Sequence, residues 1–460
     1  MFIFPLIFIV AFFVAMKEVL KGNRAGILIF LIFGLSIYTT AMSVTFMLGL
    51  KTLIPFFQFF KEILVSSVLT LNFINLKRWP KFHLIDYLIL AFLGYTVLYT
   101  ILPIGEQNFL GRLLALKSMS FYIAVYFAGR LFDPKDVYIN KYFSYVALLT
   151  VAAGAVLCVE LAVGVQMQTY TGFTDYIFYF FNMESGGSFG LVTTFESDGG
   201  YRRFASFFSN PLEYAAATLI ALSIILSLYT TDNNKLKINN FGMMALAASF
   251  LAIIFALSRA PLASYFIVIY IYTLITKRKT IIKIIHAGFV VAVVYVIYLF
   301  IKFENSSDGL VAVLLSTIDF SNPSSVGHLQ QWLEGILAMI AHPLGLGLGA
   351  SGRVAGAAGE NVGGENQFII IGVQAGIIAL LLYLITFVNF IRVGIRWLPK
   401  LEGKERKVCM AVLLIKVGLI IPLLTSEVES SSYISFMNWF FSGLLISLIM
   451  QPKTPTVTAA

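Results

Sequence analysis

The stretch QFIIIGVQAGIIALLLYLITFVNFI at residues 367–391 contains no charged residue and is followed by a basic segment that begins RVGIRWLPK. A helix needs about 20 apolar residues to cross the hydrocarbon core of a bilayer, so this stretch predicts a transmembrane helix. Similar runs recur along the chain, of which 59% is hydrophobic and 12% charged. Soluble domains are about 45–50% apolar. The composition therefore predicts an integral membrane protein.

Thirteen apolar runs predict an all-α, polytopic helix bundle of about 13 transmembrane helices, with residues 1–460 forming one membrane domain. The first run lacks the charged start and the cleavage site of a signal peptide, so we expect it to be retained. The runs cover roughly residues 2–16, 25–50, 53–75, 84–103, 112–131, 142–163, 208–229, 240–257, 260–276, 281–301, 367–391, 408–424 and 433–450.

The basic residues sort to one side of this predicted bundle. If the N-terminus is placed outside the cytoplasm, the inner connections collect 22 of the 32 lysines and arginines. Positive charge near span ends is retained in the cytoplasm, so we expect the N-terminus outside and the C-terminus inside. This topology, together with anionic inner-leaflet lipid, also accounts for the net charge of +9. A nucleic-acid partner is therefore not expected.

Two outward connections are long, at about residues 164–207 and 302–366. The second contains a helical pattern at about 325–341, preceded by Ser324 and Ser325 as possible N-cap residues. This predicted helix is too short and too polar to span, so we expect it to lie on the outer surface. Irregular backbone cannot face lipid inside the hydrocarbon. We therefore expect both connections to cover the outer mouth or to line a wet cavity.

A few arginines lie on the outward side, against the general sorting of charge. Two of them precede Asn210 and Pro211, a helix start whose backbone N–H groups favour an anion. Another lies at the membrane boundary between two apolar runs, where its charge is costly unless it is paired or wet. Because guanidinium binds phosphate oxygens bidentately, the residues that predict a phosphate site are Arg202, Arg203, Arg259 and Arg353.

Structural explanations of these residues stay open. Arg202 and Arg203 could bind lipid headgroups or pair with Glu196 and Asp198. The arginine between the two apolar runs could form a salt bridge with an outer-loop carboxylate, and the last one could belong to a flexible glycine-rich linker. Glu213 is better explained as a capping residue of the following helix than as a ligand.

The candidates for a catalytic proton acceptor also lie in the second outward connection, and are His328, His342, Glu360 and Glu365. An attacking hydroxyl group must lose its proton, which a positioned histidine or carboxylate can accept. We favour His328 and Glu365, although His328 could simply pack with Trp332 one turn away. Asn366 is a predicted N-cap. No group of ligand-type residues has the spacing of a metal site, so no metal and no cofactor are expected.

The order of these motifs resembles the O-antigen polymerase and O-antigen ligase family over roughly residues 200–390. The motifs are RRFASFFSNP, then SRAP between two spans, then a long outer segment with a Trp-bearing helix, HPLGLGLG and GENQF. The resemblance implies a glycosyltransferase of the bacterial inner membrane with its active site on the periplasmic side. It also implies a donor glycan carried on undecaprenyl pyrophosphate, with arginines holding the pyrophosphate.

The chain departs from the family pattern at two positions, and the second departure favours a polymerase over a ligase if the family histidine is the general base of the ligase. Many members have arginine before the Trp-bearing helix, where this chain has His328. Many have His-Asn before the next span, where this chain has Glu365 and Asn366. The expected partners are an undecaprenyl-pyrophosphate-linked oligosaccharide, an acceptor glycan or glycolipid, and the lipid bilayer.

Two other classes of protein compete with a glycosyltransferase. A lipid-linked glycan flippase or other transporter would place ionisable residues at mid-membrane, and Lys61, Glu62 and Lys416 are the candidates. A sensor or structural membrane protein would leave the outward arginines unexplained.

Overall fold

A computed structural model describes residues 1–76, 79–132, 137–197, 199–303, 323–352, 355 and 361–450. Over these residues the protein is all-α, and the only extended pairings are two isolated bridges. Ten helical segments are long and apolar enough to cross a membrane, and two shorter apolar helices accompany them. The chain is therefore a multi-pass membrane protein, whereas the count of thirteen spans stays a prediction.

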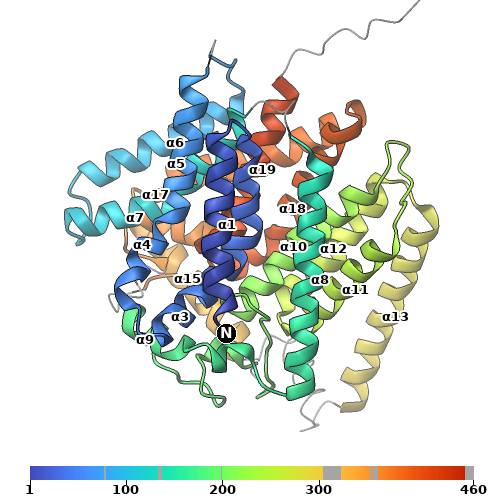
Figure 1. The fold of residues 1–460 in the computed structure, drawn as a ribbon. Helices are drawn as coiled ribbons and strands as arrows, with labels where there is room; N and C mark the ends of the chain where they lie inside the picture. The colour runs from blue at the N-terminus through green and yellow to red at the C-terminus, as the bar shows by residue number, and fades with distance from the viewer. Residues whose placement is uncertain are drawn as a thin grey trace, which may run out of the picture.

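The long segments begin with α1 (Ile3–Leu20), a broken segment Arg24–Met47 that ends in α3 (Tyr38–Met47), and Lys51–Ile74, which contains α4 (Ile54–Gln58) and α5 (Phe60–Ile74). The others are α6 (Leu84–Ile101), α7 (Phe109–Arg130), α8 (Ile139–Val163), α10 (Pro211–Tyr229), α17 (Gln367–Trp397, extended to Lys400), α18 (Gly403–Thr425) and α19 (Ser432–Met450). The shorter apolar helices are α11 (Asn240–Phe255) and α12 (Arg259–Ile275), and α13 (Lys279–Phe303) lies at the edge of the bundle (Figure 1).

The centre of the bundle is formed by α10, α18 and α19. The apolar segments of these helices are 78%, 72% and 94% buried inside the protein. Helix α19 packs closely along α7 at two glycines, Gly129 and Gly443. A β-carbon on Gly129 would overlap the carbonyl oxygen of Phe440, and one on Gly443 would overlap that of Tyr126. Small residues of this kind let membrane helices approach with their backbones in contact.

One end of the bundle carries the N-terminus and the long segment between α8 and α10, at the bottom of Figure 1. We call it the loop end. The segment includes a short helix, α9 (Phe173–Phe181), that the apolar pattern did not predict. It is fixed to the bundle where it approaches α10: the Glu160 carboxylate accepts hydrogen bonds from the backbone N–H of Met167 (2.8 Å) and Ser206 (3.0 Å). Thr40 donates to the carbonyl of Phe207.

Helix α15 (Pro323–Ala341) occupies the place of the predicted surface helix and packs against α17. It begins at Pro323, so Ser324 and Ser325 lie in its first turn and do not precede it as N-cap residues, which corrects the predicted start. Gly335 lies against Gly363 and Ile369. Apolar side chains on another face of α15, among them Leu333, are exposed and available to lipid.

Helix α17 is interrupted at Gly376, which has φ 79° and ψ 178°. The glycine-rich segment 343–349 packs into the interruption and satisfies the freed backbone groups. This is how irregular backbone is tolerated at membrane depth. The described part of the glycine-rich stretch is thus a packed element, not a linker. Three hydrogen bonds join the two segments: Leu346 N to Val373 O (2.7 Å), Gly347 N to Gln374 O (3.1 Å) and Ile377 N to Pro343 O (3.0 Å).

Candidate functional site

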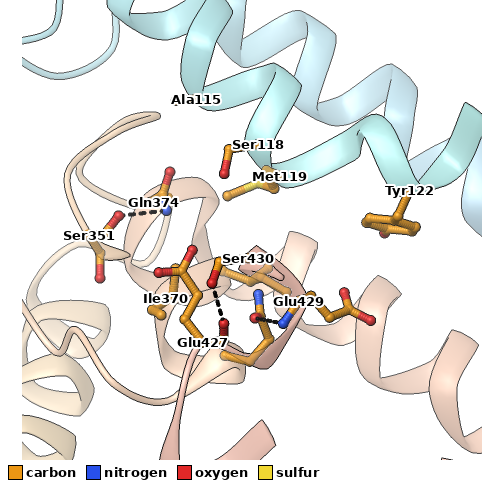
Figure 2. A pocket seen from close by; sticks show the side chains of 12 residues that line it. Ala115, Ser118, Met119, Tyr122, Ser351, Ile370, Gln374, Glu427, Glu429 and Ser430 are labelled. Atoms are coloured by element: carbon orange, nitrogen blue, oxygen red, sulfur yellow. Dashed lines mark hydrogen bonds between the residues drawn. The ribbon is translucent and has the colours of Figure 1, made fainter. Parts of the chain in front are cut away.

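A small polar cavity of about 20 Å³ opens at the loop end, between α7, the first turns of α17 and the connection from α18 to α19 (Figure 2). Gln374, in the turn before the interruption of α17, donates to the carbonyl of Ser351 (2.9 Å) and accepts from the N–H of Gly349 (2.8 Å). The interruption therefore builds one wall. The cavity is lined by Ala115, Ser118, Met119, Tyr122, Ser351, Gln367, Ile370, Ile371, Gln374, Glu427, Glu429 and Ser430.

Two carboxylates of the cavity come from a single short connection, TSEVESSS, between α18 and α19. The connection forms a 3-10 turn, η9 (Val428–Ser430). The Glu427 side chain points toward Ser351, and a β-carbon on Gly352 would lie 3.1 Å from its Oε2 (Figure 2). On the other side, the backbone N–H of Glu429 donates to Gln367 Oε1 (3.4 Å). This turn brings two acidic groups to the entrance of α17.

Side chains of α19 hold the carboxylate of Glu429 in place. Its Oε1 accepts hydrogen bonds from Trp439 Nε1 (2.6 Å) and Asn438 Nδ2 (3.2 Å). Burial raises the pKa of the Glu429 carboxyl above its usual range, while the positive charge of Lys416 and these two hydrogen bonds oppose the rise. Burial and the charge of Lys416 thus shift the pKa of this carboxyl in opposite directions. A buried carboxyl with a specific charged partner is typical of functional sites.

Lys416 of α18 is fully buried, and its ammonium lies among aromatic rings beneath the cavity. Nζ is 4.0 Å from the ring centre of Trp439, 4.7 Å from Phe390 and 5.2 Å from Phe387. It has no hydrogen-bond partner among the residues that the structure describes. Cation–π contacts stabilise a desolvated ammonium by about 2 kcal/mol, so the rings and the field of Glu429 together stabilise this charge.

The two favoured proton acceptors lie together. His328 of α15 and Glu365, just before α17, are 2.8 Å apart from Nδ1 to Oε2, and their side chains are 28% and 49% exposed. Asn366 caps α17 by accepting from the N–H groups of Phe368 and Ile369. The pair therefore lies at the start of α17, beside Gln367 in the cavity wall. By contrast, His342 is exposed at the end of α15, and Glu360 lies outside the described residues.

The structure brings the Arg203 segment to the corner where Arg259 begins α12. Arg203 Nε donates to the carbonyl of Ala256 (3.0 Å), the last residue before the turn into α12. The next residue, Phe204, donates its N–H to the carbonyl of Phe255 (3.1 Å). Two segments more than fifty residues apart are thereby fixed at one corner of the loop end.

Arg202 lies apart from this corner. Its guanidinium lies over the ring of Phe189, 4.4 Å from the ring centre. The Glu196 carboxylate accepts from the N–H (2.8 Å) and hydroxyl (2.9 Å) of Ser188, while Glu196 and Arg202 form a backbone bridge. Arg353 and Asp198 lie outside the described residues, so the predictions for them stay predictions.

Of the predicted arginines that the structure describes, Arg202, Arg203 and Arg259 do not line the cavity, and its carboxylates are the residues that sequence reasoning missed. A hydrogen bond links the two regions: Ser431, next to the cavity, donates to Glu213 Oε1 (2.5 Å) at the start of α10. Asn210 caps α10 as predicted, accepting from Glu213 N (2.9 Å). Glu213 in turn accepts from Ser209 N (3.0 Å), so it is a capping residue that also contacts the cavity turn.

Among the residues described, no group of three histidine, cysteine, aspartate or glutamate side chains is placed to hold a metal ion. Comparison of the chain with protein-family models and with curated proteins gave no match. What the chain does must therefore be argued from its own residues.

Proposed function

We propose that this protein is a membrane glycosyltransferase that moves a glycan from undecaprenyl pyrophosphate to a hydroxyl of an acceptor glycan. The transfer takes place at the loop end, which we assign to the periplasmic side of the bacterial inner membrane. The favoured activity is that of an O-antigen or surface polysaccharide polymerase. Joining of the glycan to lipid A-core by a ligase is the alternative within the same class.

The observation that carries the proposal is that the Arg203 segment is hydrogen-bonded to the end of α11 and the turn that leads into Arg259. A cation at the edge of the hydrocarbon is costly, and an anionic ligand bound at this corner would stabilise both arginines. Pyrophosphate suits guanidinium groups, which bind its oxygens bidentately and stay charged. Arg203 Nε donates a hydrogen bond to the carbonyl of Ala256, which fixes the position of the Arg203 side chain.

In the proposed reaction, the acceptor hydroxyl oxygen forms a bond to the anomeric carbon of the donor sugar while the bond from that carbon to the pyrophosphate oxygen breaks. The arginines stabilise the negative charge that develops on the leaving pyrophosphate. The hydroxyl proton passes to Glu365 or His328, whose contact of 2.8 Å allows one group to orient the other. The reaction written in this way needs neither a metal ion nor a nucleotide.

Replacement of Arg259 by alanine tests the proposal. We expect polymer to be lost in cells while the amount of membrane-inserted protein is unchanged, because Arg259 is an exposed residue at the first position of α12. Lys51→Ala is the matched control, since Lys51 also lies at the loop end but contacts the rings of Phe46 and Tyr179. Normal polymer length and amount in the Arg259 variant would refute the role of the arginines.

A transporter of lipid-linked glycans is the second candidate, and two observations favour it. Lys416 is an ionisable group buried within the bundle, and α17 is a discontinuous helix next to a polar cavity. Transporters combine both features near their substrate sites. The leaflet in which lipid-linked glycan accumulates in a deletion strain separates the two functions. Accumulation in the outer leaflet supports the enzyme, and accumulation in the inner leaflet supports the transporter.

A further inference from the structure

A second cavity of about 200 Å³ adjoins the first one in the loop-end half of the bundle. It lies between α5, α7 and the start of α19. Ser118, Tyr122, Glu429 and Ser430 line both cavities, so the second cavity leads from the side of the bundle to the carboxylate described above. We call it the side chamber. Its other lining residues are Lys61, Glu62, Leu114, Lys117, Phe121, Ser432, Ser435 and Phe436.

The entrance of the side chamber carries a charged group with an excess of one positive charge. Glu62 Oε1 lies 2.7 Å from Nζ of Lys117 and 3.7 Å from Nζ of Lys61. Lys61 also donates to the Tyr38 hydroxyl and to the carbonyl of Gln58, whereas the Lys117 side chain is 47% exposed. Both lysines therefore lie close to Glu62, but Lys61 is enclosed by protein, whereas Lys117 is half exposed and can contact a bound anion as well.

The interior of the side chamber is suited to a neutral ligand with many hydroxyl groups. Serine hydroxyls and the Glu429 carboxylate line it together with the rings of Phe121 and Phe436. These two rings are stacked, with centres 5.5 Å apart. Glu62 Oε2 is buried and receives no hydrogen bond from the described residues, so it can accept one from a ligand. Apolar walls with a few placed polar groups are typical of small-molecule sites.

A purely anionic headgroup fits this chamber poorly. Two carboxylates, Glu62 and Glu429, face it, and like charges disfavour each other strongly where water is scarce. A sugar joined to a pyrophosphate places its neutral part against the carboxylates and its charge against Lys117. An ordinary anionic phospholipid lacks the ring of hydroxyls.

We infer that the side chamber binds the headgroup of a second lipid-linked glycan, with the phosphate at Lys117 and a sugar hydroxyl at Glu429. This inference rests on the proposed glycosyl transfer, for which it identifies the acceptor site. The arginine corner then holds the donor, and the two cavities join the sites through Glu429 and Ser430. An acceptor that is itself lipid-linked is the substrate of a polymerase.

Counting bound lipids tests the inference without relying on turnover. Native mass spectrometry of the purified full-length protein is performed with a short polyprenyl-pyrophosphate-linked oligosaccharide. We expect up to two bound molecules for the wild type, and one for Lys117→Glu. Loss of a charge-assisted hydrogen bond costs about 1.5–3 kcal/mol, so acceptor affinity falls about tenfold or more. Ser118→Trp, which fills the chamber from an exposed position on α7, gives the same result if the chamber is the site.

Controls separate this site from the arginine corner. Arg259→Ala is expected to lose the other bound molecule, and Lys51→Ala to keep both. If the Arg259 variant binds two molecules while the Lys117 variant binds one, the proposed donor site fails and the chamber stands. If the Lys117 and Ser118 variants both bind two molecules, the inference is overturned. Displacement of the glycolipid from the chamber by an equal concentration of phosphatidylglycerol would overturn it as well.

Discussion

Gly376 provides a sharp test of how the site is built, because it combines an unusual backbone conformation with a close contact. Its φ of 79° and ψ of 178° lie in a region that only glycine occupies readily. A β-carbon at this position would lie 2.6 Å from the carbonyl carbon of Leu344 and 2.6 Å from the oxygen of Pro343. Both are backbone atoms, so the contact cannot be relieved by turning a side chain.

The cost of Gly376→Ala follows from two contributions. The backbone conformation itself costs about 1–3 kcal/mol for a residue with a β-carbon. Relief of the overlap separates segment 343–349 from α17 and breaks the three hydrogen bonds that join them, at about 0.5–1.5 kcal/mol each. The sum is a loss of about 2.5–7.5 kcal/mol in the free energy of unfolding. That is a large part of the stability of most proteins, which is about 5–15 kcal/mol.

The measurement is reversible unfolding of the purified protein in mixtures of mild detergent and dodecyl sulfate, with Gly94→Ala as the matched control. Gly94 lies within α6, and a β-carbon there would meet no atom within 4 Å. The control is therefore expected to be neutral or to gain up to about 1 kcal/mol from helix propensity. Equal stabilities of the Gly376 and Gly94 variants would show that segment 343–349 does not pack into α17 as described.

Two further predictions concern the acid groups of the site. Lys416→Met removes the cation that lowers the pKa of Glu429, so this already raised pKa rises further. As the pH is lowered, acceptor binding is therefore expected to be lost at a higher pH than in the wild type. If the acceptor KM of the variant depends on acidic pH as it does in the wild type, the prediction is contradicted. Single replacements His328→Gln and Glu365→Gln are expected to reduce transfer about as much as both together, because groups that act as a pair are not additive; additive losses of kcat would show that the two act separately.

The pKa of Glu429 also determines how the stability of the folded protein changes with pH. Burial raises the pKa of Glu429 in the folded state, so the folded protein binds this proton more tightly than the unfolded chain does. Stability from this group is therefore present at low pH and decreases as the pH rises from the unfolded pKa to the folded one. Removal of the Lys416 charge widens that range toward higher pH.

Much of the architecture could be predicted because lipid imposes simple rules on sequence. Apolar length located helices such as α8 and α18, and the capping residues Asn210 and Asn366 marked helix starts that the structure also has. Hydropathy could not predict the interruption of α17, because Gly376 lies within an apolar run whose composition is equally suited to a straight helix. The interruption depends on a partner segment about thirty residues earlier in the chain.

The carboxylates of the cavity were missed for a related reason. The search for functional groups followed positive charges in long connections, whereas Glu427 and Glu429 lie in a connection of a few residues between two apolar runs. The signal was present, since two acidic residues in so short a turn between two membrane spans are costly without partners. The side-chain partners of Glu429 come from α19, and Gln367 of α17 accepts from its backbone N–H; no sequence pattern indicates that these helices meet.

The arrangement of charge also bears on the choice between enzyme and transporter. A transporter must open its site to both sides of the membrane, whereas an enzyme needs access from one side. Here the charged and hydroxyl groups that line the two cavities lie in the loop-end half of the bundle. Next to them, Lys416 is enclosed by the rings of Phe387, Phe390 and Trp439. Opening a path past these rings would expose a cation that they and Glu429 now stabilise. The aromatic floor therefore favours chemistry at the loop end over passage through the bundle.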